Sequence, residues 1–257
     1  MNAPASLGTL WLVPAPLDLG AAESPLDTVL PQAALARAAM LQHWVVEDAK
    51  SARALLKRVA QHQPLAQPLQ ALHMVELPRP PKGAGRSPAP AIDWAALLAP
   101  ALQGHDLGLL SEAGLPAVAD PGSALVAAAH DAAVPVQPIS GPSSLMLALA
   151  ASGLNGQSFG FVGYLPQEAA ERQARIQALE ALSRQQRQTQ IAIETPYRNG
   201  ALLQALVQTL QPGTRLSVSC GLTLDGGFTR SAPVTMWRRQ PLALPDRLPA
   251  VFCWLAG

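Results

Sequence analysis

The chain has 257 residues, of which 49% are hydrophobic and only 14% are charged, and its formal net charge at pH 7 is +1. This composition is typical of a folded globular protein and excludes general disorder. Because the total charge is almost zero, binding to nucleic acid or to anionic lipid would require a local basic patch. The length permits one large core or two smaller ones.

Cysteine and histidine usage gives no sign of a metal site. Cys220 and Cys253 stand alone in expected strands, and the five histidines are scattered. We therefore expect no metal, and two buried thiols in a reducing compartment are favoured over a disulfide. We also expect no secretory leader and no membrane span, because neither the leader pattern nor an uninterrupted apolar run of about 18 residues occurs. These features together predict a cytoplasmic protein without a membrane partner.

The first half of the chain alternates expected strands and helices. Apolar runs predict strands at residues 9–13, 43–46, 72–77, 106–110 and 135–139. Helical spacing predicts helices within 27–41 and at 49–60, 92–102 and 122–132. Strands separated by helices of this length predict a mostly parallel sheet with helices on both faces.

The second half begins with a helix of small residues at 143–152 that is expected to link two domains, 7–142 and 143–257. Further helices are expected at 168–187 and 199–210, and strands at 159–165, 190–194, 215–219, 233–237 and 250–255. Because these strands follow one another with few helices, we expect a mixed α/β domain.

Three short loops rich in Gly, Pro and Ser follow expected strands, at residues 14–16, 111–116 and 140–144. Ligands of open α/β sheets bind at the carboxyl ends of strands, and small residues let the backbone approach a ligand. Any one of these loops alone is typical of an ordinary turn, but three at one sheet edge indicate a ligand site. The third loop also begins a helix, whose free N–H groups favour an anionic group, with ordinary capping as the alternative.

Several well-known site motifs are absent from the sequence. No G-x-G-x-x-G follows the first expected strand, and there is neither a P-loop nor a G-x-S-x-G elbow. A Rossmann dinucleotide site, nucleotide hydrolysis and serine-hydrolase chemistry are therefore disfavoured.

The same loops carry a resemblance to a known family. SEAGLPAVADPG (residues 111–122) is similar to the SDAGTPLISDPG stretch of the ribosomal RNA small-subunit methyltransferase I group, within the tetrapyrrole-methylase superfamily. PISGPSSLMLALAASGL (138–154) resembles PLPGPCAAITALSASGL, and FGFVGYLP (159–166) resembles FxxEGFLP. LWLVPAPLDL (10–19) and VVEDAKSARALL (45–56) resemble LYLVPTPIGNL and AAEDTRHTGLLL. The matches come in order and span most of the chain.

The resemblance implies a two-domain class III methyltransferase fold that binds S-adenosylmethionine in a cleft between the domains, in a homodimer. It also implies methyl transfer to a ribose 2′-hydroxyl of small-subunit ribosomal RNA. The positions it assigns to cofactor binding are Pro14, Pro16, Ser111, Gly114, Leu115, Pro116, Val118, Ser143, Ser144, Thr195, Leu222, Pro249 and Ala250.

Methyl transfer to a hydroxyl requires alignment, exclusion of water and a proton acceptor. Carboxylates at the ends of expected strands are the candidates for that acceptor: Glu47, Asp48 and Glu194. Lys50 and Arg198 are candidates to hold an anionic substrate. A helix N-cap is the alternative for Asp48, and a structural ion pair is the alternative for Glu194 and Arg198.

The sequence departs from the family pattern mainly on the substrate side. The family's Gly-Asn after its first loop is replaced within LDLG at residues 17–20, and its EDTR becomes EDAK at 47–50. Lysine cannot reproduce a bidentate arginine contact. A methyltransferase acting on a tetrapyrrole or another small molecule, and a non-catalytic cofactor- or RNA-binding protein, therefore stay open beside the RNA enzyme.

Two basic segments have two interpretations each. Residues 78–90 carry three cations among prolines and glycines, which fits a basic lid over a substrate or an inert linker. Four arginines lie on the expected long helix of the second half, at 168–187, and a solvated face is favoured over a binding surface for them. They are Arg172, Arg175, Arg184 and Arg187.

Overall fold

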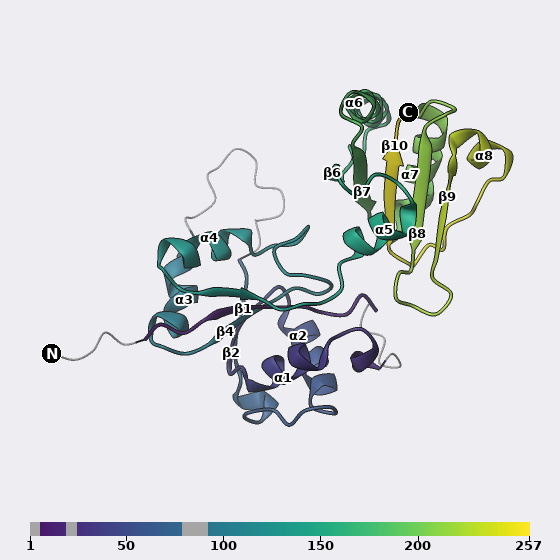
Figure 1. The fold of residues 1–257 in the computed structure, drawn as a ribbon. Helices are drawn as coiled ribbons and strands as arrows, with labels where there is room; N and C mark the ends of the chain where they lie inside the picture. The colour runs from purple at the N-terminus through teal and green to yellow at the C-terminus, as the bar shows by residue number, and fades with distance from the viewer. Residues whose placement is uncertain (1–5, 19–24, 79–91) are drawn as a thin grey trace. The chain divides into compact units, whose positions relative to one another are not determined.

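The computed structural model describes residues 6–18, 25–78 and 92–257, and the chain divides into two compact units (Figure 1). The first unit is Met1–Pro142 and the second is Ser143–Gly257. The suggested lid at residues 78–90 falls, apart from residue 78, outside the described residues. None of the described helices is long and apolar enough to cross a membrane.

The first unit contains a fully parallel five-stranded sheet with the order β3-β2-β4-β1-β5. Its strands are β1 (Leu10–Val13), β2 (His43–Val46), β3 (His73–Glu76), β4 (Leu107–Leu110) and β5 (Val136–Pro138). All five lie within a residue or two of the strands expected from the apolar runs. The predicted parallel sheet is therefore confirmed.

Helices cover both faces of this sheet, as Figure 1 shows. One face packs against α1 (Gln32–Met40) and α2 (Ala49–Val59), and the other against α3 (Trp94–Leu102) and α4 (Ser123–Asp131). Successive strand side chains point to opposite faces, so Trp44 and Val46 join the α1–α2 core while Val45 joins the α3–α4 core. Two short 3-10 helices complete the described unit, Leu26–Thr28 and Leu69–Ala71.

The strand order reverses between β4 and β1, which lie side by side in the sheet. The chain leaves β1 through α1 on one face and leaves β4 through α4 on the opposite face. The helices that follow β1 and β4 therefore lie on opposite faces of the sheet, on either side of the carboxyl ends of these two strands. Such a topological switch point is where open α/β sheets bind ligands.

The second unit contains a mixed five-stranded sheet with the order β6-β7-β10-β8-β9, in which β6 and β7 are parallel and the other pairs antiparallel. The small-residue helix α5 (Ser144–Ser152) packs on one face. Helices α6 (Ala169–Gln186), α7 (Asn199–Thr209) and α8 (Val234–Arg239) supply the core of the other face. The strands are β6 (Phe159–Tyr164), β7 (Thr189–Glu194), β8 (Arg215–Cys220), β9 (Phe228–Pro233) and β10 (Ala250–Leu255), and a 3-10 helix spans Pro196–Arg198.

One expected strand of the second unit is wrong. Residues 233–237 end β9 and begin α8, in which Val234 and Trp237 are buried at helical spacing and Pro233 is the N-cap. The Trp237 indole N–H donates to the Leu216 carbonyl at 2.9 Å, which fixes this helix against β8. The true strand, β9, is an edge strand whose six residues are all half-buried, so it shows no alternation that a sequence pattern would reveal.

Both cysteines lie in the core of the second unit. Cys220 and Cys253 are free thiols buried in β8 and β10. Burial raises the pKa of the Cys253 thiol to about 12, so this side chain is an inert core group. Within the described residues, no group of three His, Cys, Asp or Glu side chains is arranged to hold a metal ion.

Gly108 in β4 is required by its close contact with a buried tryptophan. A Cβ at this position would lie 2.5 Å from the Trp44 ring, which is 1% exposed. We expect Gly108→Ala to lower the free energy of unfolding by about 2 kcal/mol, because an overpacked core must shift. Chemical denaturation measures this loss. Gly156→Ala is the control, since a Cβ there has no neighbour within 4 Å among the described residues. A loss that persists undiminished in a Trp44→Leu background would contradict the steric explanation.

Candidate functional site

The loops after β1 and β4 are joined at the switch point by a pair of backbone hydrogen bonds. The Ala15 N–H donates to the Gly114 carbonyl at 2.8 Å, and the Gly114 N–H donates to the Ala15 carbonyl at 3.0 Å. Gly114 has a φ of 71°, in the left-handed region that favours glycine. This bridge fixes two loops that are almost a hundred residues apart in sequence.

The third expected loop reaches the same place. A Cβ at Gly141 would lie only 2.1 Å from the Pro14 Cβ, so the backbone of this loop packs directly on the proline ring. A Cβ at Gly114 would lie 3.7 Å from the Pro142 carbonyl oxygen. The three loops therefore converge at one sheet edge, as their glycines and prolines suggested.

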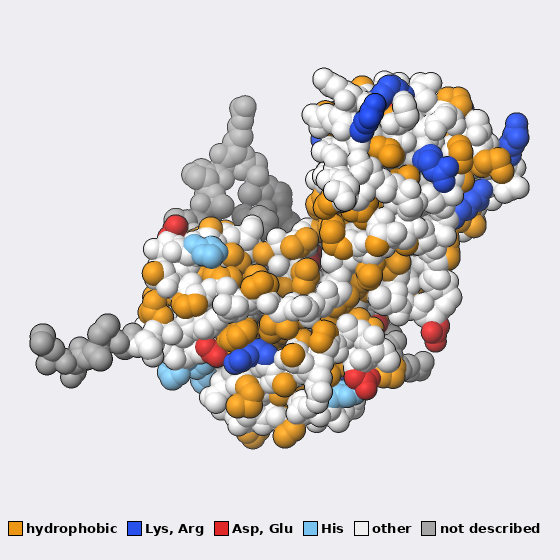
Figure 2. Space-filling model, in the orientation of Figure 1, with side chains coloured by type: hydrophobic (Ala, Val, Ile, Leu, Met, Phe, Trp, Pro, Cys, Tyr) orange, Lys and Arg blue, Asp and Glu red, His pale blue; other side chains and the backbone are white. Residues whose placement is uncertain are grey.

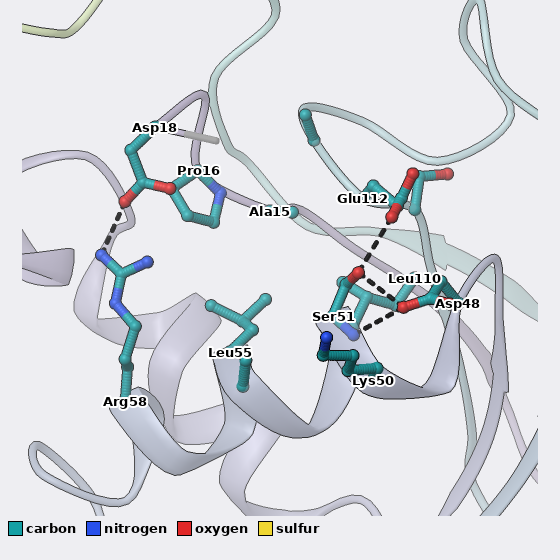
Figure 3. A pocket seen from close by; sticks show the side chains of 13 residues that line it. Ala15, Pro16, Asp18, Asp48, Lys50, Ser51, Leu55, Arg58, Leu110 and Glu112 are labelled. Carbon is teal, nitrogen blue, oxygen red and sulfur yellow. Dashed lines mark hydrogen bonds and ion pairs between the residues drawn. The ribbon is translucent and has the colours of Figure 1, made fainter. Parts of the chain in front are cut away.

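A pocket of about 630 Å³ opens beside this bridge (Figure 3). The loop after β1 forms one wall, the end of β4 forms another, and one face of α2 forms the floor. The side chains lining it are Ala15, Pro16, Asp18, Asp48, Lys50, Ser51, Ala54, Leu55, Arg58, Leu110, Ser111, Glu112 and Ala113.

Hydrogen bonds join the start of α2 to the loop after β4. Asp48 is the N-cap of α2 and accepts at 2.7 Å from both the backbone N–H and the hydroxyl of Ser51. The Ser51 hydroxyl also lies 2.9 Å from a Glu112 carboxylate oxygen. Glu47 accepts from the Glu112 backbone N–H at 3.1 Å. The N-cap alternative for Asp48 is thus confirmed, and the same carboxylate lines the pocket.

A buried ion pair joins the opposite end of the pocket. The Arg58 guanidinium lies 2.6 Å from the Asp18 carboxylate, and these side chains are 12% and 4% exposed. Figure 3 shows this pair on one side of Pro16 and the Ser51 network on the other. Because Asp18 belongs to the loop after β1 and Arg58 to α2, the pair holds this loop against the helix. Removing either member would leave the other charge without compensation.

Ser111 places an unsatisfied polar atom on the pocket wall. The residue is 3% exposed, and its hydroxyl oxygen has no hydrogen-bond partner among the residues that the structure describes. A buried hydroxyl normally has a partner, and leaving one unpaired costs about 1–3 kcal/mol. Since Ser111 lines the pocket, a bound ligand is a natural partner for this atom.

Three carboxylates near the pocket influence one another. Burial, and then the negative charges of Glu47 and Glu112, raise the pKa of Asp120 from 3.8 to about 6. A carboxyl group with a pKa near neutrality can exchange a proton at physiological pH. Asp120 follows Ala119, whose φ of 64° is unusual for a residue with a side chain.

The other expected residues of the first unit lie in the same region. Lys50 lines the pocket floor beside Ser51. Leu115, Pro116 and Val118 belong to the loop after β4 but are not among the residues that line the pocket, and Val118 is 45% exposed. Their assignment to cofactor binding stays a prediction.

The remaining expected residues belong to the second unit. Glu194 ends β7 and accepts two hydrogen bonds from Arg198, at 2.7 and 3.1 Å, so these residues form the structural ion pair considered above. Thr195 donates its N–H to the same Glu194 oxygen at 2.7 Å. Ala250 pairs with Glu194 and with Cys220, and the Gly221 N–H donates to the Pro249 carbonyl at 3.0 Å. Thr195, Leu222, Pro249 and Ala250 therefore cluster at one edge of this sheet.

Ser143 and Ser144 begin α5 in the second unit. Ser143 is the N-cap residue, but its side chain makes no capping hydrogen bond within the described structure. The suggested ordinary capping by this hydroxyl is therefore not observed, and its expected role at the cofactor stays a prediction.

Several pocket residues were missed by the sequence analysis. Asp18 stands in the sequence analysis only as part of a departure from the family pattern, and Glu112 only as a letter of the matching motif. The residues contributed by α2 do carry a signal, because they have helical spacing on a single face: Ser51, Ala54, Leu55 and Arg58.

Several curated proteins with the same name are similar to part of this chain. Ribosomal RNA small subunit methyltransferase I of Mesorhizobium japonicum is 39% identical over 127 residues, which are 49% of this chain and 42% of that protein. The protein of the same name from Micromonospora olivasterospora is 42% identical over 108 residues, 42% of this chain and 33% of that protein. The matched region thus spans less than half the length of these relatives.

Solved structures share the fold over almost the whole chain. Uroporphyrin-III-C-methyltransferase from Thermus thermophilus matches with a TM-score of 0.50 and 21% identity, covering 96% of this chain and 92% of that one. The methyltransferase CobJ matches with a TM-score of 0.52 and 16% identity, covering 97% and 95%. The expected two-domain class III α/β fold is confirmed by these likenesses.

A family model described as Tetrapyrrole (Corrin/Porphyrin) Methylases matches residues 28–229, which is well over half of the sequence. The match contains α2, β4 and the loop after β4, and so includes most of the pocket wall. The chain therefore belongs to the tetrapyrrole (corrin/porphyrin) methylase family.

Proposed function

We propose that this protein transfers the methyl group of S-adenosylmethionine to a ribose 2′-hydroxyl of small-subunit ribosomal RNA. The observation that carries the proposal is the buried, unpartnered Ser111 hydroxyl on the wall of a pocket at the switch point of the first sheet. The name shared by the curated relatives supports the choice of RNA as acceptor. Cytoplasmic location and a homodimer belong to the same proposal.

The residues present fit an adenosylated, polar cofactor. Ser111 offers a hydroxyl, and the glycines at 114 and 141 let the three loops pack closely around the pocket edge. The proposed binding set in the first unit is Pro14, Pro16, Ser111, Gly114, Leu115, Pro116 and Val118. Ser143, Ser144, Thr195, Leu222, Pro249 and Ala250 are proposed to add contacts from the second unit. When bound, the cofactor supplies a methyl group activated by its sulfonium centre.

The protein's own residues then have to orient the acceptor and take its proton. We assign the proton acceptor to Asp120, because its pKa is raised to about 6 and its charge interacts with that of Glu112, which lines the pocket. Lys50 supplies positive charge to the pocket floor, which suits a phosphate beside a ribose. Asp48 and Ser51 position the start of α2 through their hydrogen bonds.

A labelled-methyl assay tests the acceptor. The enzyme is incubated with labelled S-adenosylmethionine and one of three substrates: unmodified small ribosomal subunits, free ribosomal RNA, or a reduced tetrapyrrole. We expect label in RNA at a site that resists alkaline cleavage, because a methylated 2′-hydroxyl can no longer attack the adjacent phosphate. Label in the tetrapyrrole instead would favour the small-molecule enzyme. Cofactor binding without any labelled acceptor in a whole-cell extract would favour a non-catalytic role.

Ser111→Ala separates a ligand-binding hydroxyl from a merely buried one. We expect this variant to bind S-adenosylmethionine about 5- to 20-fold more weakly in calorimetry, because one hydrogen bond is lost. Without the ligand it should be as stable as the wild type or slightly more stable, since an unpaired buried hydroxyl has been removed. Ser217→Ala is the matched control, because the Ser217 hydroxyl is equally buried and unpartnered within the described chain but lies in the middle of β8. Unchanged affinity in Ser111→Ala would sink the assignment.

Asp120→Asn tests the electrostatics of the site. The folded protein holds the Asp120 proton up to pH about 6 and the unfolded chain releases it near 3.8, so the contribution of Asp120 to stability is lost as pH rises through that range. At pH 7.5 we expect the variant to be more stable by about 1 kcal/mol, a value reduced for the solvent around a half-buried group. The gain should shrink towards zero at pH 4.

Thermal denaturation at both pH values measures the effect. Asp225→Asn removes the same charge from an exposed loop position and should show no such pH-dependent gain. The electrostatic explanation fails if Asp120→Asn is stabilised equally at pH 4 and pH 7.5. In the methyl-transfer assay the same variant should lose at least tenfold in turnover while it still binds the cofactor.

A further inference from the structure

The two units carry opposite formal charges. Residues 1–142 contain eight Lys and Arg and eleven Asp and Glu, a charge of −3, whereas residues 143–257 contain ten arginines, no lysine and six carboxylates, a charge of +4. The overall charge of +1 therefore hides a basic second unit. Arginine is the cation best suited to phosphate, because its planar fork can donate two hydrogen bonds to one phosphate group.

Charge is also separated within the second unit. Because α6 follows β6 and runs back along the sheet, its last turn lies at the edge where β7 and β8 begin and β10 ends. This edge is opposite to the one that holds Thr195, Leu222 and Ala250. Figure 2 shows blue side chains over the α6 and α8 parts of the unit, and a red side chain at the loop between β8 and β9.

Five arginines lie along this edge, which we call the arginine edge. The Arg184 Nε–H donates to the Gly257 backbone oxygen at 3.0 Å, two residues beyond Leu255, and Leu255 pairs with Arg215. Arg215 in turn pairs with Pro233, the residue before α8. The arginine edge therefore comprises Arg184, Arg187, Arg215, Arg238 and Arg239.

Three of the five arginines of the arginine edge have no carboxylate partner among the described residues. Arg187, Arg215 and Arg239 are exposed and make no ion pair within the described part of the chain. Arg238 donates to the Val207 and Leu210 carbonyls at the end of α7, which satisfies its hydrogen bonds but keeps its charge. Glu180 is buried nearby and accepts from the Gln211 N–H and the Thr214 hydroxyl.

The other described carboxylates of the unit lie away from this edge. Glu168 and Glu171 stand at the start of α6, and Glu194 is held by Arg198 at the end of β7. Asp225 lies in the loop between β8 and β9. Asp246 is two residues from Leu248, whose carbonyl accepts from Asn199 at the start of α7. A net positive strip therefore remains at one end of the unit.

We propose that the arginine edge of the second unit binds the phosphate backbone of RNA and so anchors the substrate. The inference rests on the proposed RNA acceptor and deepens it. Strands of six residues are roughly 20 Å long, so the arginine edge is about that far from the opposite edge of the same sheet, which holds the second-unit residues proposed to contact the cofactor. A large folded RNA can span such a distance, whereas a small-molecule acceptor cannot.

RNA binding by the full chain tests the proposal. The probe is a 5′-fluorescein-labelled single-stranded RNA of mixed sequence and about 24 nucleotides, followed by fluorescence anisotropy over a range of KCl concentrations. The edge variant is Arg187→Asn, Arg215→Gln and Arg239→Gln; asparagine is used at 187 because its φ of 49° is left-handed. The control removes the same charge from exposed positions elsewhere, Arg53→Gln, Lys57→Gln and Arg175→Gln.

We expect the edge variant to bind RNA at least tenfold more weakly at 0.1 M salt, with a salt slope that falls by about 2, as for three lost phosphate contacts on a single strand. The control variant should change by less than threefold, because charges beyond about 10 Å are screened at this salt. A third variant with lysine at 187, 215 and 239 keeps the charge and should recover most of the affinity. Equal losses in the edge and control variants, or no loss in the edge variant, would overturn the proposal.

Cofactor calorimetry on the same proteins separates this inference from the proposed function. All three variants should bind S-adenosylmethionine like the wild type, which also shows that they are folded. If the wild type binds the cofactor but not RNA, the arginine edge is not an RNA anchor, and a methyltransferase with a different acceptor stays possible. If it binds RNA through the edge but not the cofactor, the methyl-transfer proposal fails and the anchor stands.

Discussion

The site depends on the close approach of the loops that follow β1 and β4. Two backbone hydrogen bonds between Ala15 and Gly114 hold them together, and the left-handed conformation of Gly114 makes this geometry accessible. The strand order of the sheet then decides what surrounds the bridge, since the helices that follow β1 and β4 lie on opposite faces. The position of the pocket thus follows from the topology of the sheet, and the side chains determine its chemistry.

Charge is distributed around this crevice in an ordered way. One end of the pocket holds a closed ion pair of Arg58 and Asp18, whereas near the other end the carboxylates of Glu47, Glu112 and Asp120 repel one another. The ion pair is rigid, whereas the neighbouring negative charges help Asp120 to keep its proton up to a pH of about 6. In the proposed transfer to a hydroxyl, position and proton removal would then be supplied by different residues.

Much of the fold could be predicted from sequence because its strands are short, apolar and bounded by proline, glycine or acidic residues. The run HWVV before Glu47 gives β2 with the right bounds, whereas β9 is an edge strand with polar residues, and the apolar pattern places its strand too late, at 233–237. The site loops could be found because glycine and proline mark unusual backbone geometry locally. Sequence alone could not reveal the ion pair of Arg58 with Asp18 or the raised pKa of Asp120. Each depends on residues that only the folded chain brings together.

The contact between Pro14 and Gly141 has a consequence for how such proteins can diverge. The glycine backbone lies so close to the proline ring that any side chain at 141 would have to displace the loop after β1. That loop is tied by Ala15 to Gly114, so one methyl group at 141 would disturb three segments at once. We therefore expect substitutions at Pro14, Gly114 and Gly141 to be rare or to occur together, and substitutions on the outer helices to be tolerated more easily.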